Sequence, residues 1–367
     1  MKIVRAAAHD FEWKREQPMT NGLHTYDTAD LTVVEIETDA GVTGYGMGRP
    51  RVGEREFREL FLTRIVGRNP LMTEAIWADL WSPKLYGRRG AETRALASID
   101  LALWDVKAKV ANLPLYQLLG GFQAELPFYV AGGYYTAGKG VRELQAELES
   151  YAALGARGVK MKVGGLSLAE DAGRVRAARE AIGDDVELLL DANCAYRAAE
   201  AIQFAKRVEE FRPFWFEEPV QPDDYDGFRA IGKATSIPLA TGENEYTKYG
   251  FRDLISTRAI SVLNPDARYT GGVTEFMKIA AMAQAHGLDI CPHGDQQAHL
   301  QLLAAIPNAG LLEYYPKQVK HMASASFVNP PEMTDHGTVL VSDEPGAGMD
   351  PAWSALEPHR RGLVEFV

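Results

Sequence analysis

Charged side chains recur along the second half of the chain at nearly constant intervals, each directly after a short apolar run. They are Lys162, Asp191, Glu217, Glu243, Asp266, His293 and Glu313, separated in turn by 29, 26, 26, 23, 27 and 20 residues. Such an interval is typical of one strand plus one helix in a βα barrel, where functional groups lie at the C-terminal ends of the strands. The spacing therefore predicts that these side chains share one rim.

Three of them, Asp191, Glu217 and Glu243, are carboxylates that would end three adjacent strands. They would repel one another unless a cation lay between them, and oxygen-only ligands suit a hard divalent ion, above all Mg²⁺. Any one of them alone could be a helix N-cap or a surface charge. Three carboxylates at corresponding strand ends favour a metal site. Asn193, two residues after Asp191, is a candidate substrate contact.

Lys160 and Lys162 lie two residues apart on one predicted strand, so both side chains lean toward the barrel interior. Two ammonium groups this close to each other and to a metal ion would lower the pKa of one of them. A neutral lysine is a usable base near pH 7. The alternative, a pair of surface lysines, does not fit a barrel-strand pattern.

Asp266 and His293 would end two neighbouring strands. The carboxylate could then accept a hydrogen bond from one ring nitrogen, which fixes the tautomer and leaves the other nitrogen to exchange protons with a substrate. A lone histidine is more often structural, and we expect this of His286 and His299.

A scaffold of eight strands must position these groups. From residue 126 onward, apolar or β-branched runs alternate with amphipathic stretches such as Val141–Leu154 and Leu168–Ile182. The runs are Leu126–Ala131, Gly158–Val163, Glu187–Asp191, Phe214–Glu217, Pro238–Thr241, Ala259–Asn264, Leu288–Pro292 and Gly310–Tyr314. Continuous apolar runs are typical of parallel strands buried on both faces, so the pattern predicts a (β/α) barrel.

The first 120 residues have a different pattern of apolar residues. Antiparallel strands are indicated at Ile3–Val4, Leu31–Glu37 and Gly44–Met47. Helical patterns follow at Val52–Arg64, Leu71–Leu80 and Thr93–Ala111. We therefore expect three parts. Residues 1–122 form an α+β capping domain, residues 123–345 form the barrel, and residues 346–367 form a tail that packs on the cap.

Composition narrows the class of protein. The chain has 367 residues, 39 Lys plus Arg against 50 Asp plus Glu, and a net charge of −11. This balance disfavours nucleic acid and anionic membranes as partners. No stretch approaches the roughly 18 apolar residues of a membrane span, and two cysteines cannot make a disulfide framework. We expect a cytoplasmic protein.

Several segments together resemble the enolase superfamily, and within it the mandelate racemase group. They are VKMKVGG (159–165), LLLDANCAY (188–196), FWFEEP (214–219), ATGEN (240–244), NPDARYTGGVTE (264–275), PHGDQQAHLQLLAA (292–305) and LLEYYP (311–316), with GVTGYG (41–46) and ASIDLALWDVKAK (97–109) in the cap. The resemblance implies an α/β fold, a (β/α)7β modified TIM barrel with an N-terminal α+β capping domain.

It also implies roles. Asp191, Glu217 and Glu243 would bind Mg²⁺, with Lys162 as one acid/base catalyst and the Asp266–His293 dyad as the other on the opposite face of the substrate. Further implied roles are Glu313 as a donor or polariser at the enediolate, and Lys160 as the group that lowers the pKa of Lys162 and contacts the substrate carboxylate. The shared step of the family is abstraction of the proton α to a carboxylate.

The segment AGGYYTAGKG (131–140) resembles the D-tartrate dehydratase branch of that group, which makes Tyr134 a candidate substrate contact. Turn-flanking aromatic packing is an equal alternative. In this family, cap loops set specificity, here about Glu16–Tyr26 and Met47–Glu56. They and the adjoining cap offer His24, Arg49 and Lys84 as contacts to a distal carboxylate or hydroxyl.

These observations predict a Mg²⁺-dependent dehydratase of a hydroxy acid, either an acid sugar or a tartrate-like diacid, that gives a 2-keto-3-deoxy acid. A racemase or epimerase using Lys162 and His293 is the alternative. A class I aldolase with a Schiff-base lysine is disfavoured by the three carboxylates, and a non-catalytic barrel would lack some of these groups. The expected partner is a small-molecule hydroxy acid, and the expected assembly is a homo-oligomer, from dimer to octamer.

Overall fold

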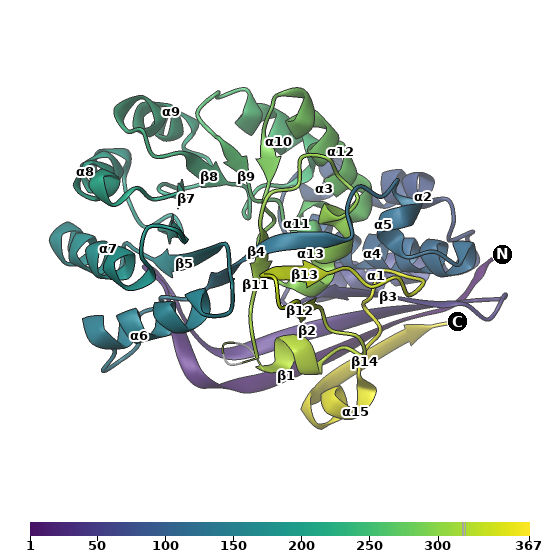
Figure 1. Ribbon diagram of the computed structural model, residues 1–367. Coiled ribbons are helices and arrows are strands. Elements are labelled where there is room, and N and C mark those ends of the chain that lie inside the picture. Colours follow the sequence, from purple (N-terminus) through teal and green to yellow (C-terminus); the bar gives the residue numbers. More distant parts are fainter. Residues whose placement is uncertain (318, 320) are drawn as a thin grey trace.

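Eight parallel strands surround one axis between residues 125 and 314 (Figure 1). They are β4 (Glu125–Ala131), β5 (Gly158–Lys162), β6 (Glu187–Asp191), β7 (Trp215–Glu217), β8 (Leu239–Thr241), β9 (Val262–Leu263), β10 (Asp289–Ile290) and β11 (Leu312–Tyr314). Successive strands from β4 to β10 pair in parallel, and β11 returns to pair with β4. The N–H group of Ile290 donates to Asn308 O at 2.9 Å, and the carbonyl of Ile290 accepts from Gly310 N at 2.8 Å. These two hydrogen bonds join β10 to the segment before β11.

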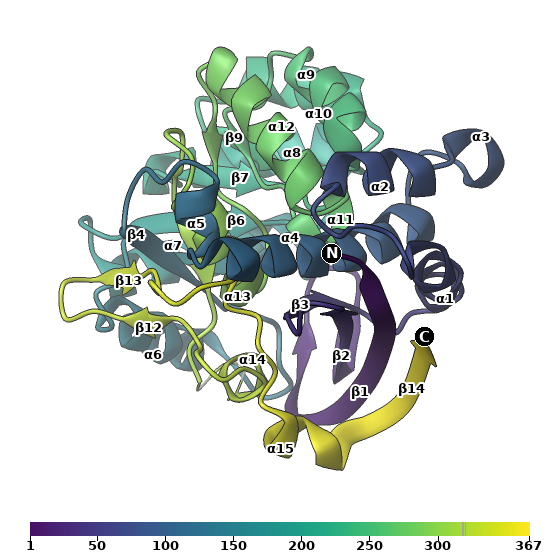
Figure 2. The ribbon, with the colours of Figure 1, turned by 90° about the vertical axis from the view of Figure 1, so that its right-hand side faces the viewer.

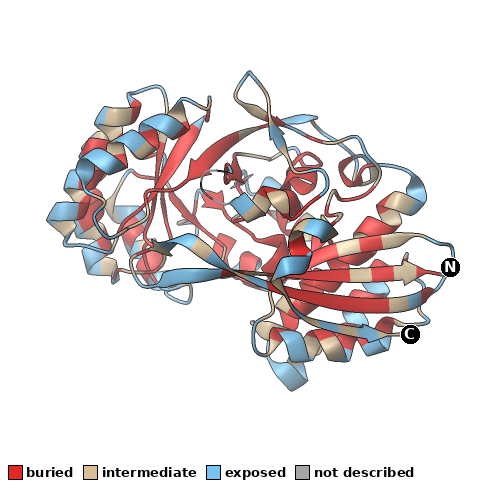
Figure 3. Cartoon of the chain, turned by 90° about the horizontal axis from the view of Figure 1, so that it is seen from below, coloured by how far each residue is buried: buried red, intermediate tan, exposed pale blue. Residues whose placement is uncertain are grey.

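This computed structural model describes residues 1–317, 319 and 321–367. Helices cover the outside of the barrel: α6 (Val141–Ala152), α7 (Leu168–Ile182), α8 (Ala198–Val208), η1 (Glu209–Phe211), α9 (Tyr225–Ala234), α10 (Thr247–Ile255), α11 (Ala267–Thr270), α12 (Val273–Ala285) and α13 (Gln296–Leu303). Strand side chains alternate, so Val159 and Met161 pack under the helices while Lys160 and Lys162 face inward. In Figure 3 the barrel strands are buried, whereas the outer sides of most of these helices are exposed. The helices α11 and α13 are buried over their whole length.

The cap is an antiparallel sheet with helices on one face (Figure 2). Its strands lie in the order β14 (Arg360–Phe366), β1 (Ile3–Thr20), β2 (Thr25–Thr38) and β3 (Thr43–Gly48). Its helices are α1 (Glu54–Ile65), α2 (Thr73–Leu80), α3 (Pro83–Tyr86), α4 (Ala91–Ala111) and α5 (Leu115–Leu118). Ala6 pairs with Phe366, so the two ends of the chain lie in neighbouring strands of this sheet.

Small elements complete the chain: α14 (His321–Ala325), β12 (Glu332–Met333), β13 (Thr338–Leu340), α15 (Trp353–Leu356) and η2 (Glu357–His359). β13 pairs antiparallel with the first residues of β4, outside the ring of eight strands. No helix in the described part of the chain is long and apolar enough to cross a membrane.

The predicted fold class is confirmed, with one local difference. Residues 16–26, expected as a cap loop, are mostly strand: β1 runs to Thr20, β2 starts at Thr25, and only four residues form the turn. The segment KREQP within β1 is polar and lacks apolar alternation, because its faces are largely exposed. Its strand conformation depends on pairing with β2, which the sequence pattern alone does not reveal.

One buried contact joins the cap to the barrel. Asp100 on α4 accepts hydrogen bonds from Thr274 N at 2.9 Å and Thr274 Oγ1 at 2.6 Å, at the first turn of α12. Trp104 Nε1 donates to the same Thr274 hydroxyl at 2.9 Å. A side chain of the cap therefore accepts from a free N–H group in the first turn of a barrel helix and complements the positive end of that helix. A residue of the helix itself usually serves this function.

We expect Asp100→Ala to lower the free energy of unfolding by about 1–3 kcal/mol, because it leaves buried donors of Thr274 without an acceptor. Chemical denaturation followed by circular dichroism measures this change. Asp253→Ala, at an exposed position on α10, is the matched control and should have little effect. An Asp100→Ala variant as stable as the control would show that this contact does not stabilise the junction.

Candidate active site

Three carboxylates meet inside the rim of the barrel because of strand register. Asp191 lies opposite Glu217 across β6 and β7, and Glu243 follows β8. One oxygen from each lies within 4.8 Å of the others, which suits a single ion. Asp191 and Glu217 are fully buried, and Glu243 Oε2 is buried without a hydrogen-bond partner.

Burial dominates the electrostatics of this cluster. It raises the pKa of Glu217 to about 8, although Lys160 opposes the shift, and burial together with the neighbouring carboxylates raises the pKa of Glu243 well above its usual range. The cluster holds more negative charge than its surroundings favour. Oxygen-only donors, close spacing and this unfavourable charge all fit a hard divalent cation such as Mg²⁺.

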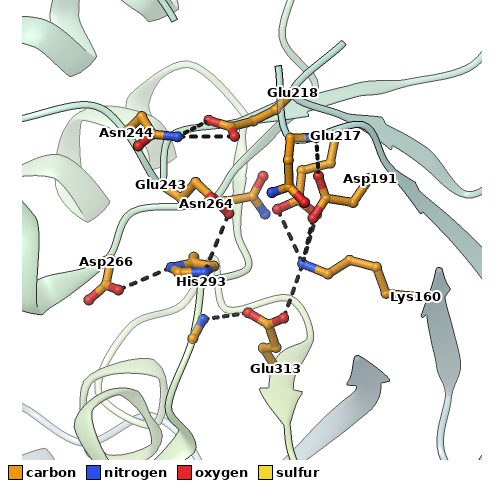
Figure 4. A network of polar contacts seen from close by, with 12 residues as sticks. Lys160, Asp191, Glu217, Glu218, Glu243, Asn244, Asn264, Asp266, His293 and Glu313 are labelled. Carbon is orange, nitrogen blue, oxygen red and sulfur yellow. Dashed lines mark hydrogen bonds and ion pairs between the residues drawn. The ribbon is translucent and has the colours of Figure 1, made fainter. Parts of the chain in front are cut away.

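Lys160 joins two parts of the rim (Figure 4). Its Nζ lies 3.0 Å and 3.2 Å from the two oxygens of Glu217 and 3.1 Å from Glu313 Oε1, and it donates to the Tyr129 hydroxyl at 3.3 Å. Burial lowers its pKa, but Glu217 and Glu313 more than compensate and raise the pKa of Lys160 well above its usual range. Lys160 is therefore a fixed positive charge at the centre of the site.

Lys162, also buried, pairs with Asp191 Oδ2 and lies 5.3 Å from the centre of the Tyr134 ring. Burial lowers the pKa of Lys162, but Asp191 and Tyr134 raise it by a larger amount. The pKa of Lys162 therefore lies above its usual value. The lowered pKa predicted from the sequence included the effect of a metal ion beside the lysines. The side chains alone do not lower this pKa, because Glu217 and Glu313 neutralise Lys160 and Asp191 directly faces Lys162.

Asp266 and His293 form the predicted dyad, with 3.1 Å between Asp266 Oδ2 and Nδ1. Arg268 also binds this carboxylate, through Nε at 2.9 Å and Nη2 at 2.5 Å. Burial would raise the pKa of Asp266, but Arg268 and the histidines hold it well below its usual value. An ionised Asp266 only accepts hydrogen bonds, so Nδ1 of His293 carries the proton. The other ring nitrogen, Nε2, lies 3.4 Å from Glu243 Oε2.

The imidazole of His293 is best described as neutral. Burial lowers its pKa below the usual value, and Asp266 only partly reverses that shift. His299, expected to be structural, is buried beside the dyad, where its Nε2 accepts from Ala267 N at 2.9 Å. His286 is exposed at the end of α12.

Glu313 lies within β11, across the ring from the three carboxylates. Its Oε2 accepts from Gly294 N, and its Oε1 accepts from the Tyr315 hydroxyl at 2.9 Å. Burial raises its pKa, but Lys160 and His293 lower it more strongly, so the pKa of Glu313 lies below its usual value. In this state Glu313 accepts hydrogen bonds and cannot donate one, and it pairs with Lys160.

The candidate substrate contacts fall into two groups. Asn193 and Tyr134 lie at the rim: Asn193 N donates to Asp191 Oδ1 at 2.8 Å while its side-chain oxygen is buried without a partner, and Tyr134 faces Lys162. The others lie on the cap. Arg49 pairs with Asp30 at 2.5 Å, whereas His24 at the β1–β2 turn and Lys84 on α3 are exposed.

The sequence pattern assigned no role to Glu218, the second carboxylate of the FWFEEP segment. It is buried, has a φ of 40°, and accepts from Asn244 Nδ2 at 2.8 Å and 3.1 Å. Burial and Asp191 raise the pKa of Glu218 to about 7. The signal in the sequence was a second acidic residue directly after a buried strand. Burying an acidic side chain there is unfavourable unless nearby groups form hydrogen bonds with it.

Arg268 was also missed, although it fixes the charge of Asp266. The sequence signal was weak, because an arginine two residues after an aspartate is common on protein surfaces. Only the fold shows that it is buried and pairs with both Asp266 and Asp295.

Comparisons with known proteins agree with this geometry. Residues 143–355 match the family described as enolase C-terminal domain-like, and residues 3–120 match the mandelate racemase / muconate lactonizing enzyme N-terminal domain. The chain belongs to the mandelate racemase group of the enolase superfamily. The predicted family is thus confirmed over both parts of the chain.

Individual relatives differ in the reaction that their names give. The chain is 31% identical to the arabinonate dehydratase of Saccharolobus solfataricus over 87% of each chain. It is 32% identical to the D-galactarolactone cycloisomerase of Agrobacterium fabrum, over 100% of this chain and 99% of the relative. A crystal structure of L-talarate dehydratase from Polaromonas sp. JS666, complexed with Mg and L-glucarate, has a TM-score of 0.88 at 29% identity, covering 100% of this chain and 99% of that one.

We expect Glu243→Gln to weaken Mg²⁺ binding by at least about tenfold, since losing even an outer-shell partner of a metal commonly has that effect. Isothermal titration of metal-depleted protein measures the affinity. Mg²⁺ should also raise the melting temperature of the wild type, by mass action and by relieving repulsion among the carboxylates. Glu149→Gln, exposed on α6, is the control. Equal affinities of Glu243→Gln and wild type would exclude Glu243 as a ligand.

Proposed function

We propose that this protein is a Mg²⁺-dependent dehydratase of an acid sugar or a related hydroxy acid, which it converts to a 2-keto-3-deoxy acid. One observation carries the proposal: the carboxylate cluster lies between two different proton-transfer groups. Lys162 contacts the cluster at Asp191, and His293 faces it at Glu243. A substrate carboxylate bound at the cluster would therefore present its α-carbon between an amine and an imidazole.

Asp191, Glu217 and Glu243 would hold the Mg²⁺, and bound Mg²⁺ stabilises negative charge on the oxygens of the substrate carboxylate. Lys160 adds a fixed positive charge next to the same oxygens, because its own partners keep it protonated. Lys162 and the Nε2 atom of His293 are the groups that accept or return a proton. Asp266 holds the Nδ1 proton of His293 and thereby orients Nε2 toward the substrate.

Dehydration needs both groups in sequence. One takes the proton from the α-carbon, and the resulting carbon–carbon double bond forms as the β-carbon releases its hydroxyl. The other group gives the proton that turns this hydroxyl into water. The enol product then becomes the 2-keto acid. Which group acts first depends on the configuration of the α-carbon, since each reaches only one face.

The relatives support this reading without fixing the substrate. One is named for an aldonic acid and another for an aldaric acid, and both are dehydratases. The arrangement of proton donors and acceptors in this chain meets the requirement of either.

Epimerisation is the second candidate, because Lys162 and His293 flank the same cluster and could return the proton on the opposite face. Incubation of substrates in D₂O distinguishes the two reactions. Deuterium at the α-carbon of recovered, inverted substrate with no keto acid would favour epimerisation, whereas keto acid formation favours dehydration.

A library of aldonic acids, aldaric acids and tartrates, assayed with Mg²⁺ for 2-keto acid formation, tests the proposal directly. At least one acid should be turned over. Intact Mg²⁺ binding with no keto acid from any member would contradict the proposed dehydration.

With an active acid in hand, we expect Lys162→Ala and His293→Asn each to lower kcat by about 10²–10⁴-fold, the usual contribution of a positioned acid or base. Circular dichroism and Mg²⁺ titration check that both variants fold and bind metal. His286→Asn, at an exposed position, should retain full activity. If both rim variants also keep full activity, the proposed roles are wrong.

A further inference from the structure

A buried ion pair on α7 lies outside the carboxylate cluster and takes no part in the proposed proton transfers. Asp171 and Arg174 are one turn apart and both are buried, and Arg174 Nη1 lies 2.9 Å from Asp171 Oδ1. Burying a charge pair is unfavourable unless further hydrogen bonds satisfy its remaining donors and acceptors. The partners of this pair therefore indicate its role.

Arg174 binds two segments of the barrel rim at once. Its Nη1 donates to the carbonyl of Lys162 at 2.9 Å, and its Nη2 donates to the carbonyl of Gly133 at 2.9 Å. Lys162 ends β5, and Gly133 lies in the segment after β4, directly before Tyr134. One side chain thus joins the main chain at the proposed acid/base lysine to the main chain beside Tyr134.

Asp171 binds the segments that follow the same two strands. Its Oδ2 accepts from Gly164 N at 2.8 Å and from Leu166 N at 3.2 Å, in the loop after β5. Its Oδ1 accepts from the Tyr135 hydroxyl at 2.7 Å, in the segment after β4. The centre of the Tyr135 ring also lies 4.0 Å from Arg174 Cζ. The ion pair is therefore satisfied by the two rim segments that adjoin the ends of β4 and β5.

These two segments pack closely where they meet. Gly133 has a φ of 61°, and a Cβ atom there would lie 2.7 Å from Met161 Cα. Lys162 N donates to the Gly133 carbonyl at 3.4 Å. The Lys162 amine lies 5.3 Å from the centre of the Tyr134 ring and pairs with Asp191. A shift of either segment would therefore move this amine relative to the carboxylate cluster.

We propose that Arg174 is a positioning residue for Lys162, because it holds the end of β5 so that the Lys162 amine meets one face of the α-carbon. This inference rests on the proposed function, in which Lys162 and His293 serve opposite faces of the substrate. The hydrogen bonds of Arg174 described above lie on the Lys162 side, whereas Asp266 holds His293. Loss of Arg174 should therefore impair proton transfer on the Lys162 face alone.

Exchange of the α-hydrogen for deuterium in D₂O, followed by mass spectrometry, measures the two faces separately. Acids of both α-configurations are supplied with Mg²⁺. In a His293→Asn protein only Lys162 can exchange the proton, and in a Lys162→Ala protein only His293 can. Adding Arg174→Met should slow the Lys162 exchange by on the order of 100-fold, since displacing a catalytic group by about 1 Å can have that effect. The His293 exchange should be nearly unchanged.

Arg176→Met is the matched control, because it makes the same change at an exposed position on α7 and should slow neither exchange. Circular dichroism and Mg²⁺ titration check that each variant folds and binds metal. If Arg174→Met does not fold, Arg174→Lys replaces it, because an ammonium keeps the charge beside Asp171 but lacks the planar fork that reaches both carbonyls. Its loss should be smaller and again confined to the Lys162 face.

Equal slowing of both exchanges by the Arg174 variant, or slowing of neither, would overturn the inference while the proposed function stands. If the wild type dehydrates no acid, the proposed function fails instead. In that case, or if the His293→Asn protein exchanges no acid, crystal structures of wild type and Arg174 variant with Mg²⁺ test the positioning alone. A displaced Lys162 amine would support it, and an unchanged contact between Lys162 Nζ and Asp191 would overturn it.

Discussion

The register of parallel strands is the constraint on which the site depends. Lys162 lies opposite Asp191 and Asp191 lies opposite Glu217, so strand pairing places one carboxylate beside a lysine and also beside a second carboxylate. Burying these carboxylates without compensation would be strongly unfavourable. The lysines that face these carboxylates therefore stabilise the fold of this rim.

The barrel alone does not complete the site. Its strand ends supply the groups that handle protons and charge, but the loops after β5 and β6 leave the mouth to be covered by the cap. The β1–β2 hairpin does this with a turn that fits against Gly164, and α4 fixes the position of the cap through Asp100 and Thr274. The barrel and the cap thus contribute different parts of this rim.

Much of this arrangement could be predicted because buried parallel strands leave a clear pattern. Polar or charged residues lie at or next to the ends of most apolar runs, and the spacing identified Asp191, Glu217 and Glu243 together. What escaped prediction depends on contacts through space. The direction of the Lys162 pKa shift follows from Asp191 opposite it, and the ionised state of Asp266 follows from Arg268, which the fold buries beside it.

The acidic balance of the whole chain gives a misleading picture of the site. Most carboxylates near the rim face a cation: Asp191 faces Lys162, Glu217 and Glu313 share Lys160, and Asp266 faces Arg268. Glu243 faces the neutral imidazole of His293, and Glu218 accepts from Asn244. These three cations offset only part of the negative charge, and a divalent cation at the cluster would offset most of the rest. The proposed anionic substrate would then meet a rim whose carboxylates are largely balanced, although the net charge of the chain is −11.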